Sequence, residues 1–301
     1  MAITGLADLG DTIPTILARA HFQEDFDSVM RSVCWNYKSD KGTTTNIPYW
    51  GKLTAAKLTE KVDMISSESI VDTNVQITPY EAGLKTILTY NAIEDDNEDM
   101  KSVAGRLMGS AFETLRDSDL LGQMDDATVS LAGAGTTLTM GHVAAGRATL
   151  VGNTAAGGKA PMPFVCVIHP NQELDIVDVL TPLMPFGVVT VAGTALAGMQ
   201  AMAGGLAEEA MRHYSVGRLF GIPILVDGNL TIDASDDAKG GIFSSGEGGG
   251  IIYVEKRAPE IKPDDDPSMR GVELNYVGRY GVGEYLAGWI VELYTDAAAP
   301  A

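Results

Sequence analysis

The chain has 301 residues, of which 21 are Lys or Arg and 40 are Asp or Glu, and its formal net charge is −19 at pH 7. A chain of this length can bury a substantial core without metals or disulfides. Its acidic balance repels phosphate backbones and anionic lipid surfaces, which argues against a sequence-reading nucleic-acid binder and against docking on a membrane.

The cysteine pattern and the N-terminal residues indicate a protein made in a reducing cytoplasm. Cys34 and Cys166 have no CxxC or Cys/His spacing around them, so both are expected to be buried small hydrophobic residues. The first residues lack the basic and apolar segments of a secretory signal. Residues 179–207 carry no charge. They contain prolines, however, and their apolar content is mostly Ala and Gly, so they do not predict a membrane span.

The N-terminal third predicts one helix followed by strands. Apolar residues in 13–35 recur at largely helical spacing, and a polar, Thr-rich break follows at 39–46. Residues 47–90 are rich in Thr, Val and Ile with partial alternation, which is typical of strands. Nothing in this strand-rich segment predicts a compact local core.

The clearest single element is a long amphipathic helix that follows the acidic run 94–99. Apolar side chains from Met100 to Leu121 recur every three or four residues, and the helix is expected to run to about Asp126. It would have roughly thirty residues and a length of about 45 Å. The acidic run complements the positive end of the helix dipole, so it is interpreted as a helix start and not as a metal site.

The second half alternates between helix and strand patterns. After a Gly/Thr break at 131–137, helices are expected at 142–151, 171–180 and 206–214, and strands at 164–170, 217–230, 251–256, 272–280 and 287–294. An acidic turn is expected at 263–271. This alternation, without internal repeats, predicts an α+β class with an antiparallel element near the end.

No catalytic, cofactor or metal-binding set emerges from the motifs. The histidines are scattered, and His169, at a strand end, is interpreted as structural. Asp233 opens a pattern like a calcium loop, but Ala238 and Ser244 occupy the positions that require Gly and Glu, so a solvated loop is expected. Residues 264–266 are three adjacent aspartates in what reads as an exposed turn. A chain this long without a catalytic set favours a structural or interaction protein.

Three strings, taken in order, resemble the major capsid protein family of tailed bacteriophages, which has the Hong Kong 97-type fold. They are residues 77–124, which include ITPYEAGLKTILTYNAIEDDNEDM; residues 164–177 with 216–230, which include FVCVIHPNQELDIV and VGRLFGIPILVDGNL; and residues 240–293, which include GGIIYVEKRAPEIKPDDDPSMRG. The resemblance covers nearly the whole chain, from about residue 46 to residue 293.

The resemblance implies a division of the chain into four parts. These are an N-terminal arm at 1–41, an extended β-hairpin loop (E-loop) at 42–82, a peripheral domain around the long spine helix at 83–136 and 242–301, and an axial domain at 137–241. In this family the subunit assembles into pentamers and hexamers of an icosahedral shell that encloses double-stranded DNA. The implied location is the virion, after synthesis and assembly in the host cytoplasm.

The resemblance also implies candidates for contacts between subunits. They are Trp50, Lys52, Lys57 and Lys61 in the E-loop, Ala192 and Ala203 in the uncharged stretch near the symmetry axes, and Asp264, Asp265, Asp266 and Arg270 near three-fold contacts. A cross-link from a loop lysine to Asn275 is not expected. Implied partners are other copies of the chain, a portal, and a separate scaffold or decoration protein, without sequence-specific DNA binding and without a membrane. The few basic residues are expected to form pairs between subunits.

Other interpretations stay open at this point. An encapsulin-type nanocompartment has the same fold and differs in its contents. An acidic metal-dependent hydrolase would use residues 264–266 or 233–237, and an accessory virion protein such as a tail or decoration component is a further alternative.

Overall fold

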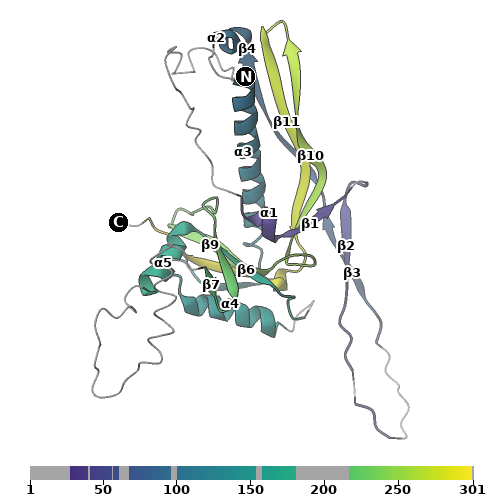
Figure 1. Ribbon diagram of the computed structural model, residues 1–301. Coiled ribbons are helices and arrows are strands. Elements are labelled where there is room, and N and C mark those ends of the chain that lie inside the picture. The colour runs from purple at the N-terminus through teal and green to yellow at the C-terminus, as the bar shows by residue number, and fades with distance from the viewer. Residues whose placement is uncertain are drawn as a thin grey trace, which may run out of the picture.

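The computed structural model describes residues 28–39, 41–55, 57–60, 68–95, 100–153, 158–180 and 217–299. They form an elongated sheet with a long helix along it, a compact second sheet flanked by helices, and a two-stranded ribbon that projects from the body (Figure 1). Helices combined with mixed sheets confirm the predicted α+β class.

The elongated sheet has four strands in the order β1-β10-β11-β4. Their bounds are Trp35–Lys38 for β1, Tyr80–Thr89 for β4, Ile251–Asp266 for β10 and Gly271–Glu284 for β11. β11 is antiparallel to both β10 and β4, while β1 runs parallel to β10. The expected antiparallel element near the end of the chain is therefore present, and it reaches back to β4 in the first third of the sequence.

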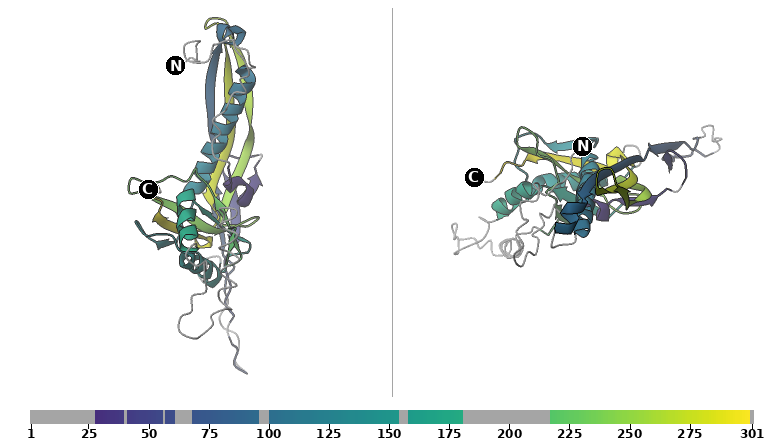
Figure 2. Two further views of the ribbon diagram at one scale, coloured as in Figure 1. Left: turned by 60° about the vertical axis from the view of Figure 1, so that its left-hand side comes forward. Right: turned by 90° about the horizontal axis from the view of Figure 1, so that it is seen from above.

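Helix α3 (Met100–Gly122) has 23 residues and lies along the elongated sheet (Figures 1 and 2). At 1.5 Å per residue it is about 35 Å long. It ends before the expected Asp126 because the amides of Met124 and Asp125 bond carbonyls three residues back, in a tighter turn. A separate short helix, α2 (Tyr90–Asp95), takes up the start of the acidic run that was expected to begin the long helix.

The contact between α3 and the sheet depends on one aromatic side chain and one glycine. Phe112 is fully buried, and its ring meets those of Tyr276 and Tyr280 edge-on at centroid distances of 5.2 and 5.7 Å. A Cβ at Gly278 would lie 2.7 Å from the Phe112 ring, so only glycine leaves room for it. The helix therefore sits close to the middle of β11.

The compact sheet has six strands in the order β5-β12-β9-β6-β8-β7. Their bounds are β5 Val129–Ala132, β6 Phe164–Ile168, β7 Arg218–Leu219, β8 Ile222–Val226, β9 Asp237–Ser244 and β12 Ile290–Asp296. Helices α4 (Met140–Gly152) and α5 (Pro170–Leu180) and the short 3₁₀ helix η3 (Ala287–Trp289) complete it. The expected strand at 217–230 is two short strands joined by a turn.

Two strands of the compact sheet arise where the sequence predicted loops. β9 is central, between β12 and β6, although residues 233–244 were expected to be solvated. Its Gly240 and Gly241 are required by close packing, since a Cβ would lie 2.7 Å from the Val167 carbonyl oxygen and from the Met124 sulfur, respectively. Glycines imposed by packing look like a loop in the sequence, which explains the error. β5 likewise ends within the expected break at 131–137.

The projecting ribbon consists of β2 (Thr45–Trp50) and β3 (Asp72–Ile77), which pair antiparallel (Figure 1). At its root, Ile47 and Ile77 are buried against Ile252 and Val254 of β10. Only the root therefore has a core, which agrees with the expected hairpin that lacks one of its own.

Of the predicted helix at 13–35, residues 13–27 lie outside the residues that the structure describes, and the described end is helical but ends early. Helix α1 covers only Met30–Val33, and Trp35 already belongs to β1. The open edge of β10 captures this segment by backbone pairing, which overrides its local helical spacing. Cys34 and Cys166 are buried free thiols, as expected.

Strand pairing intermixes the parts of the chain that the resemblance assigned to two domains. β5 and β12 were expected in the peripheral domain, but they pair within the sheet that contains β6 and β8. β4 crosses the expected boundary at 82, and β9 crosses the one at 241. The four-part division stays a prediction. Within the described ranges, no helix is both long and apolar enough to cross a membrane.

Candidate functional site

The most unusual surface is on the projecting ribbon and the two chain segments beyond it. Large apolar side chains are exposed there; we call this set the ribbon surface, and its members are Trp50 (67%), Leu53 (53%), Leu58 (66%), Ile70 (66%) and Val71 (56%). A hairpin this thin is marginally stable in water, and contiguous exposed apolar residues mark an interaction site. The ribbon surface is therefore suited to lie against another protein surface.

The predicted ribbon residues fall on or beside this surface. Trp50 is its largest member, and Lys52 and Lys57 are exposed next to it. Lys61 lies outside the residues that the structure describes. Glu68 accepts a hydrogen bond from the Thr54 amide at 2.6 Å, which joins the two segments beyond the paired strands.

The three aspartates at the tip of the elongated sheet were expected in a turn, but they form the end of strand β10. Asp264 and Asp265 pair with Glu273 and Val272 of β11, and the turn proper is residues 267–270. The Tyr90 hydroxyl donates a hydrogen bond to Asp265, and the Tyr90 amide donates to the Arg270 carbonyl at 2.9 Å. The aspartates therefore belong to a fixed structure that also includes the start of α2.

Asp266 has a structural task of its own at this tip. One of its carboxylate oxygens accepts hydrogen bonds from the Ser268 amide (2.9 Å), the Ser268 hydroxyl (2.6 Å) and the Met269 amide (3.3 Å). These bonds, above all that from the Ser268 hydroxyl, hold the pKa of Asp266 below its usual range. Asp264 and Arg270 are exposed at the same tip.

Asp266→Asn is expected to lower the melting temperature, because an amide replaces the ionised acceptor of these bonds. Asp264→Asn is the matched control and is expected to leave the melting temperature unchanged. Since folding lowers the pKa of Asp266, the ionised carboxyl stabilises the folded protein at pH values above its usual pKa. This stabilisation is lost as the pH falls through the lowered pKa. Thermal unfolding by circular dichroism checks this; equal melting temperatures for the two variants would contradict it.

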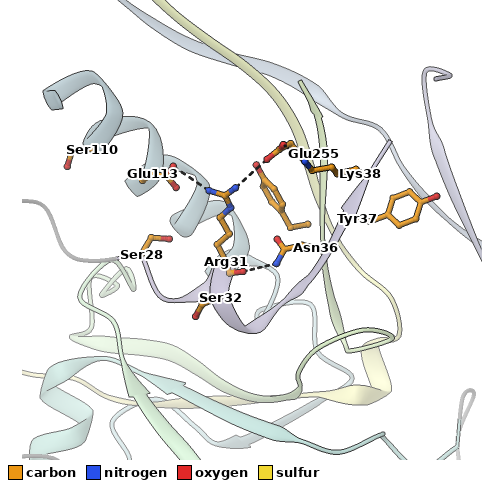
Figure 3. Close-up of a pocket in the computed structure, with 10 residues that line it drawn as sticks. Ser28, Arg31, Ser32, Asn36, Tyr37, Lys38, Ser110, Glu113 and Glu255 are labelled. Carbon is orange, nitrogen blue, oxygen red and sulfur yellow. Dashed lines mark hydrogen bonds and ion pairs between the residues drawn. The ribbon is translucent and has the colours of Figure 1, made fainter. Parts of the chain in front are cut away.

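A cavity of about 650 Å³ lies between α1, β1, α3 and β10 (Figure 3). The charged side chains that line it form ion pairs with each other. Arg31 points between two acids, with guanidinium nitrogens 3.7 Å from Glu113 and 3.4 Å from Glu255. Lys38 also approaches Glu255, at 4.0 Å. These ion pairs connect α1 and β1, at the start of the described chain, to α3 and β10.

A buried arginine lies behind this cavity. Arg116 of α3 is almost fully buried, with its guanidinium carbon 5.3 Å from the ring centre of Phe112 and 5.6 Å from that of Tyr253. It donates to the Tyr253 hydroxyl at 3.1 Å and also pairs with Glu113. Sequence reasoning missed Arg116, although its i+4 spacing from Phe112 places it on the buried stripe of the helix.

The other candidate residues have structural contacts. His169 accepts the Asn171 amide at 3.1 Å, and so caps the start of α5, as its interpretation as structural implied. Asp233 accepts the Ser235 and Asp237 amides at 2.8 and 3.1 Å and the Tyr294 hydroxyl at 2.8 Å. Asp237 is buried, not solvated, and accepts the Gly135 amide at 2.7 Å. Among the described residues, no group of three or more His, Cys, Asp or Glu is arranged to hold a metal ion.

A comparison with protein families identifies what this architecture is. A family model described as phage capsid protein matches residues 72–291, which is most of the chain. The chain belongs to the phage capsid protein family. No curated protein matches its sequence.

Solved structures show that the capsid protein has the fold of phage shell proteins. The acid-stable capsid of Helicobacter pylori bacteriophage KHP30 is 9% identical, with a TM-score of 0.73 over 99% of each chain. The head of Helicobacter pylori bacteriophage KHP40 is 10% identical, with a TM-score of 0.70 over 99% of this chain and 100% of that one. Mycobacterium phage Che8 is 15% identical, with a TM-score of 0.68 over 94% and 97%.

These findings confirm the recognised family and the Hong Kong 97-type fold. The capsid protein is a major capsid protein, a structural component of the bacteriophage virion. The family match favours neither the encapsulin-type compartment nor the acidic hydrolase.

Proposed function

We propose that this capsid protein assembles into pentamers and hexamers of an icosahedral shell that encloses phage double-stranded DNA. The ribbon surface carries the proposal, because its five large apolar side chains have 53–67% of their area exposed on a ribbon that has a core only at its root. A second copy of the chain would cover them. Burial of apolar area at several such contacts stabilises a closed shell even when each contact is weak.

The parts of the chain then take the roles that the family resemblance implies. Residues 1–41 would be the arm, 42–82 the E-loop over a neighbour, 83–136 with 242–301 the peripheral domain, and 137–241 the axial domain. Ala192 and Ala203 lie outside the described residues; their uncharged stretch would approach copies of itself at the five- and six-fold axes. The tip with Asp264–Asp266 would approach copies of itself at three-fold contacts, where Arg270 would offset the acidic charge.

The charge distribution fits a wall that confines DNA without gripping it. With a net charge of −19, the subunit repels phosphates on average, so DNA can slide during packaging and ejection. Basic residues were expected to pair between subunits, yet many pair within the chain, namely Arg31, Lys38, Lys85, Arg116, Lys239, Arg257 and Lys262. Two of these pairs, Lys38 with Glu255 and Lys85 with Glu273, join neighbouring strands of the elongated sheet, so this positive charge is neutralised locally.

The capsid protein would act by assembly and rigid-body rearrangement, without catalysing a reaction. Its partners would be other copies of the chain, a portal, and a separate scaffold or a decoration protein. Assembly would take place in the host cytoplasm.

The test is electron microscopy of the purified protein and of a double variant, Trp50→Ser with Leu53→Ser. The wild type is expected to form closed shells or rings of capsomers. The double variant is expected to lose them while keeping its unfolding free energy within about 0.5 kcal/mol of the wild type, because both side chains are already exposed.

Asn74→Ala, a polar exposed position of β3 on the same ribbon, is the matched control and should assemble normally. Shells from the double variant in normal yield would contradict the role of the ribbon surface. Failure of the wild type to form any higher assembly would contradict the proposed function itself.

A further inference from the structure

Two carboxyl groups lie buried together against residues 28–30, the first residues that the structure describes. Asp117 belongs to α3 and has no exposed area, and Asp227, which follows β8, is 1% exposed. The Asp117 side chain lies against that of Asp227, and Asn229 donates hydrogen bonds to both carboxyl groups. Two carboxyl groups at this distance in a water-excluded site cannot both ionise at low cost.

The pair holds three consecutive residues of the chain, Ser28, Val29 and Met30; we call this set of contacts the arm joint. Asp117 accepts the Ser28 hydroxyl at 2.8 Å and the Met30 amide at 3.1 Å. The Val29 backbone lies against Asp227, where it lowers the pKa of that carboxyl. Residues 28–30 are therefore fastened to the body by these two carboxyl groups.

One side-chain amide completes the joint and leaves a single oxygen without a donor. Asn229 donates its side-chain amide to Asp117 at 3.0 Å and its backbone amide to Asp227 at 2.9 Å. The second oxygen of Asp227, Oδ2, is buried and has no hydrogen-bond donor among the described residues. A proton placed between the two carboxyl groups would satisfy it.

The other titratable groups around the pair do not neutralise it. From α1, Cys34 stays a neutral thiol because burial raises its pKa to about 12. Arg31, on the same helix, is engaged by Glu113 and Glu255. From α3, Arg116 is directed to Glu113 and Tyr253. In the described part of the chain, no Lys, Arg or His forms an ion pair with Asp117 or Asp227.

We propose that Asp117 and Asp227 share one proton that locks residues 28–30 onto the body, and that loss of this proton releases the arm joint. With the proton in place, one carboxyl donates to the other, and every buried oxygen of the pair has a partner. Without it, two adjacent carboxylates repel each other, and water reaches them most directly by displacing residues 28–30. This device rests on the geometry of one subunit and does not depend on the proposed function.

The direction of the pH dependence follows from the proton. Burial, and then the contact with Asp117, raises the pKa of Asp227 to about 7. An opened joint would expose this carboxyl to water and return its pKa to the ordinary acidic range, so the closed joint binds a proton that the open joint releases. The joint is therefore most firmly closed at acidic pH. Its closing equilibrium weakens by about tenfold for each pH unit between the ordinary acidic range and about 7, and it levels off above the pKa of about 7.

Hydrogen exchange of the full-length protein, read by mass spectrometry in peptides covering residues 28–34, tests the proposal. Between about pH 6 and about pH 8.5, after correction for intrinsic exchange rates, protection in the wild type is expected to fall by about tenfold or more. Asp227→Asn places a permanently neutral amide in the joint, so its protection is expected to be independent of pH. Asp117→Asn is a second variant with the same expected loss of pH dependence.

Glu284→Gln is the matched control, because burial also raises the pKa of Glu284 to about 7 and this residue lies at the end of β11, outside the joint. Its profile for residues 28–34 is expected to follow the wild type. Flat protection in the wild type would overturn the proposal. Loss of the pH dependence in Glu284→Gln would also overturn it. The same holds if a folded aspartate variant, Asp227→Asn or Asp117→Asn, keeps the full pH dependence of the wild type.

Discussion

Replacement of Phe112 by alanine is expected to reduce the unfolding free energy of the capsid protein by about 3 to 5 kcal/mol. The phenyl ring is 1% exposed and fills the space between α3 and β11, where it contacts Tyr276, Tyr280 and the Gly278 backbone. Its removal leaves a cavity that the rigid sheet cannot close, and the buried Arg116 loses one of the two rings against which it lies. Urea unfolding followed by circular dichroism measures the loss.

Leu115→Ala is the matched control for this variant. Leu115 lies on the same helix but is 44% exposed, so its truncation is expected to change the unfolding free energy by less than about 1 kcal/mol. Equal losses for the two variants would mean that α3 is not held to the sheet by its buried face. Since α3 packs along the elongated sheet, Phe112→Ala is also expected to reduce the yield of shells.

Gln172→Leu is expected to have a comparable effect, a loss of about 3 to 5 kcal/mol, through polar groups and not through volume. Gln172 is fully buried in α5, and its amide donates to the Ala238 carbonyl at 2.9 Å and to the Thr295 hydroxyl at 2.7 Å. Its carbonyl oxygen accepts the His169 amide at 2.9 Å. Leucine leaves these groups buried without partners, at about 1 to 3 kcal/mol each.

The measurement is again urea unfolding, with Asp178→Ala as control. Asp178 is exposed on the same helix, and its removal is expected to change stability by less than about 0.5 kcal/mol. A loss below about 1 kcal/mol for Gln172→Leu would show that the compact sheet re-forms its hydrogen bonds around an apolar side chain. The role assigned here to Gln172, which joins α5 to β9 and β12, would then be wrong.

Elements with strong local periodicity were predictable from the sequence, and elements fixed by distant contacts were not. The spacing from Met100 to Leu121 gave α3, and the apolar run from Phe164 to Ile168 gave β6. β9 was missed because its Gly240 and Gly241 are required by close packing against Val167 and Met124, which are distant in the sequence. The end of the N-terminal helix was predicted too late for the same reason, since pairing with β10 makes Trp35 part of a strand.

The candidate surfaces divide in the same way. Trp50 and the aspartates 264–266 could be singled out from the sequence, yet only the structure shows that Asp265 contacts Tyr90 and that Asp266 caps its turn. The arm joint was invisible in the sequence. Asp117 and Asp227 are 110 positions apart, and no local pattern indicates that two acids so distant will be buried side by side.

The sequence by itself determined the class, the long helix, the coreless hairpin and the family. Periodicity, composition and the order of segments can all be read along the chain without knowledge of its tertiary contacts. The tertiary structure alone decided which strands are central, which charges are buried and where residues 28–30 are fastened. These depend on long-range contacts, and burial changes the chemistry of a side chain: the same aspartate is a solvated anion on a surface and a shared-proton partner beneath α1.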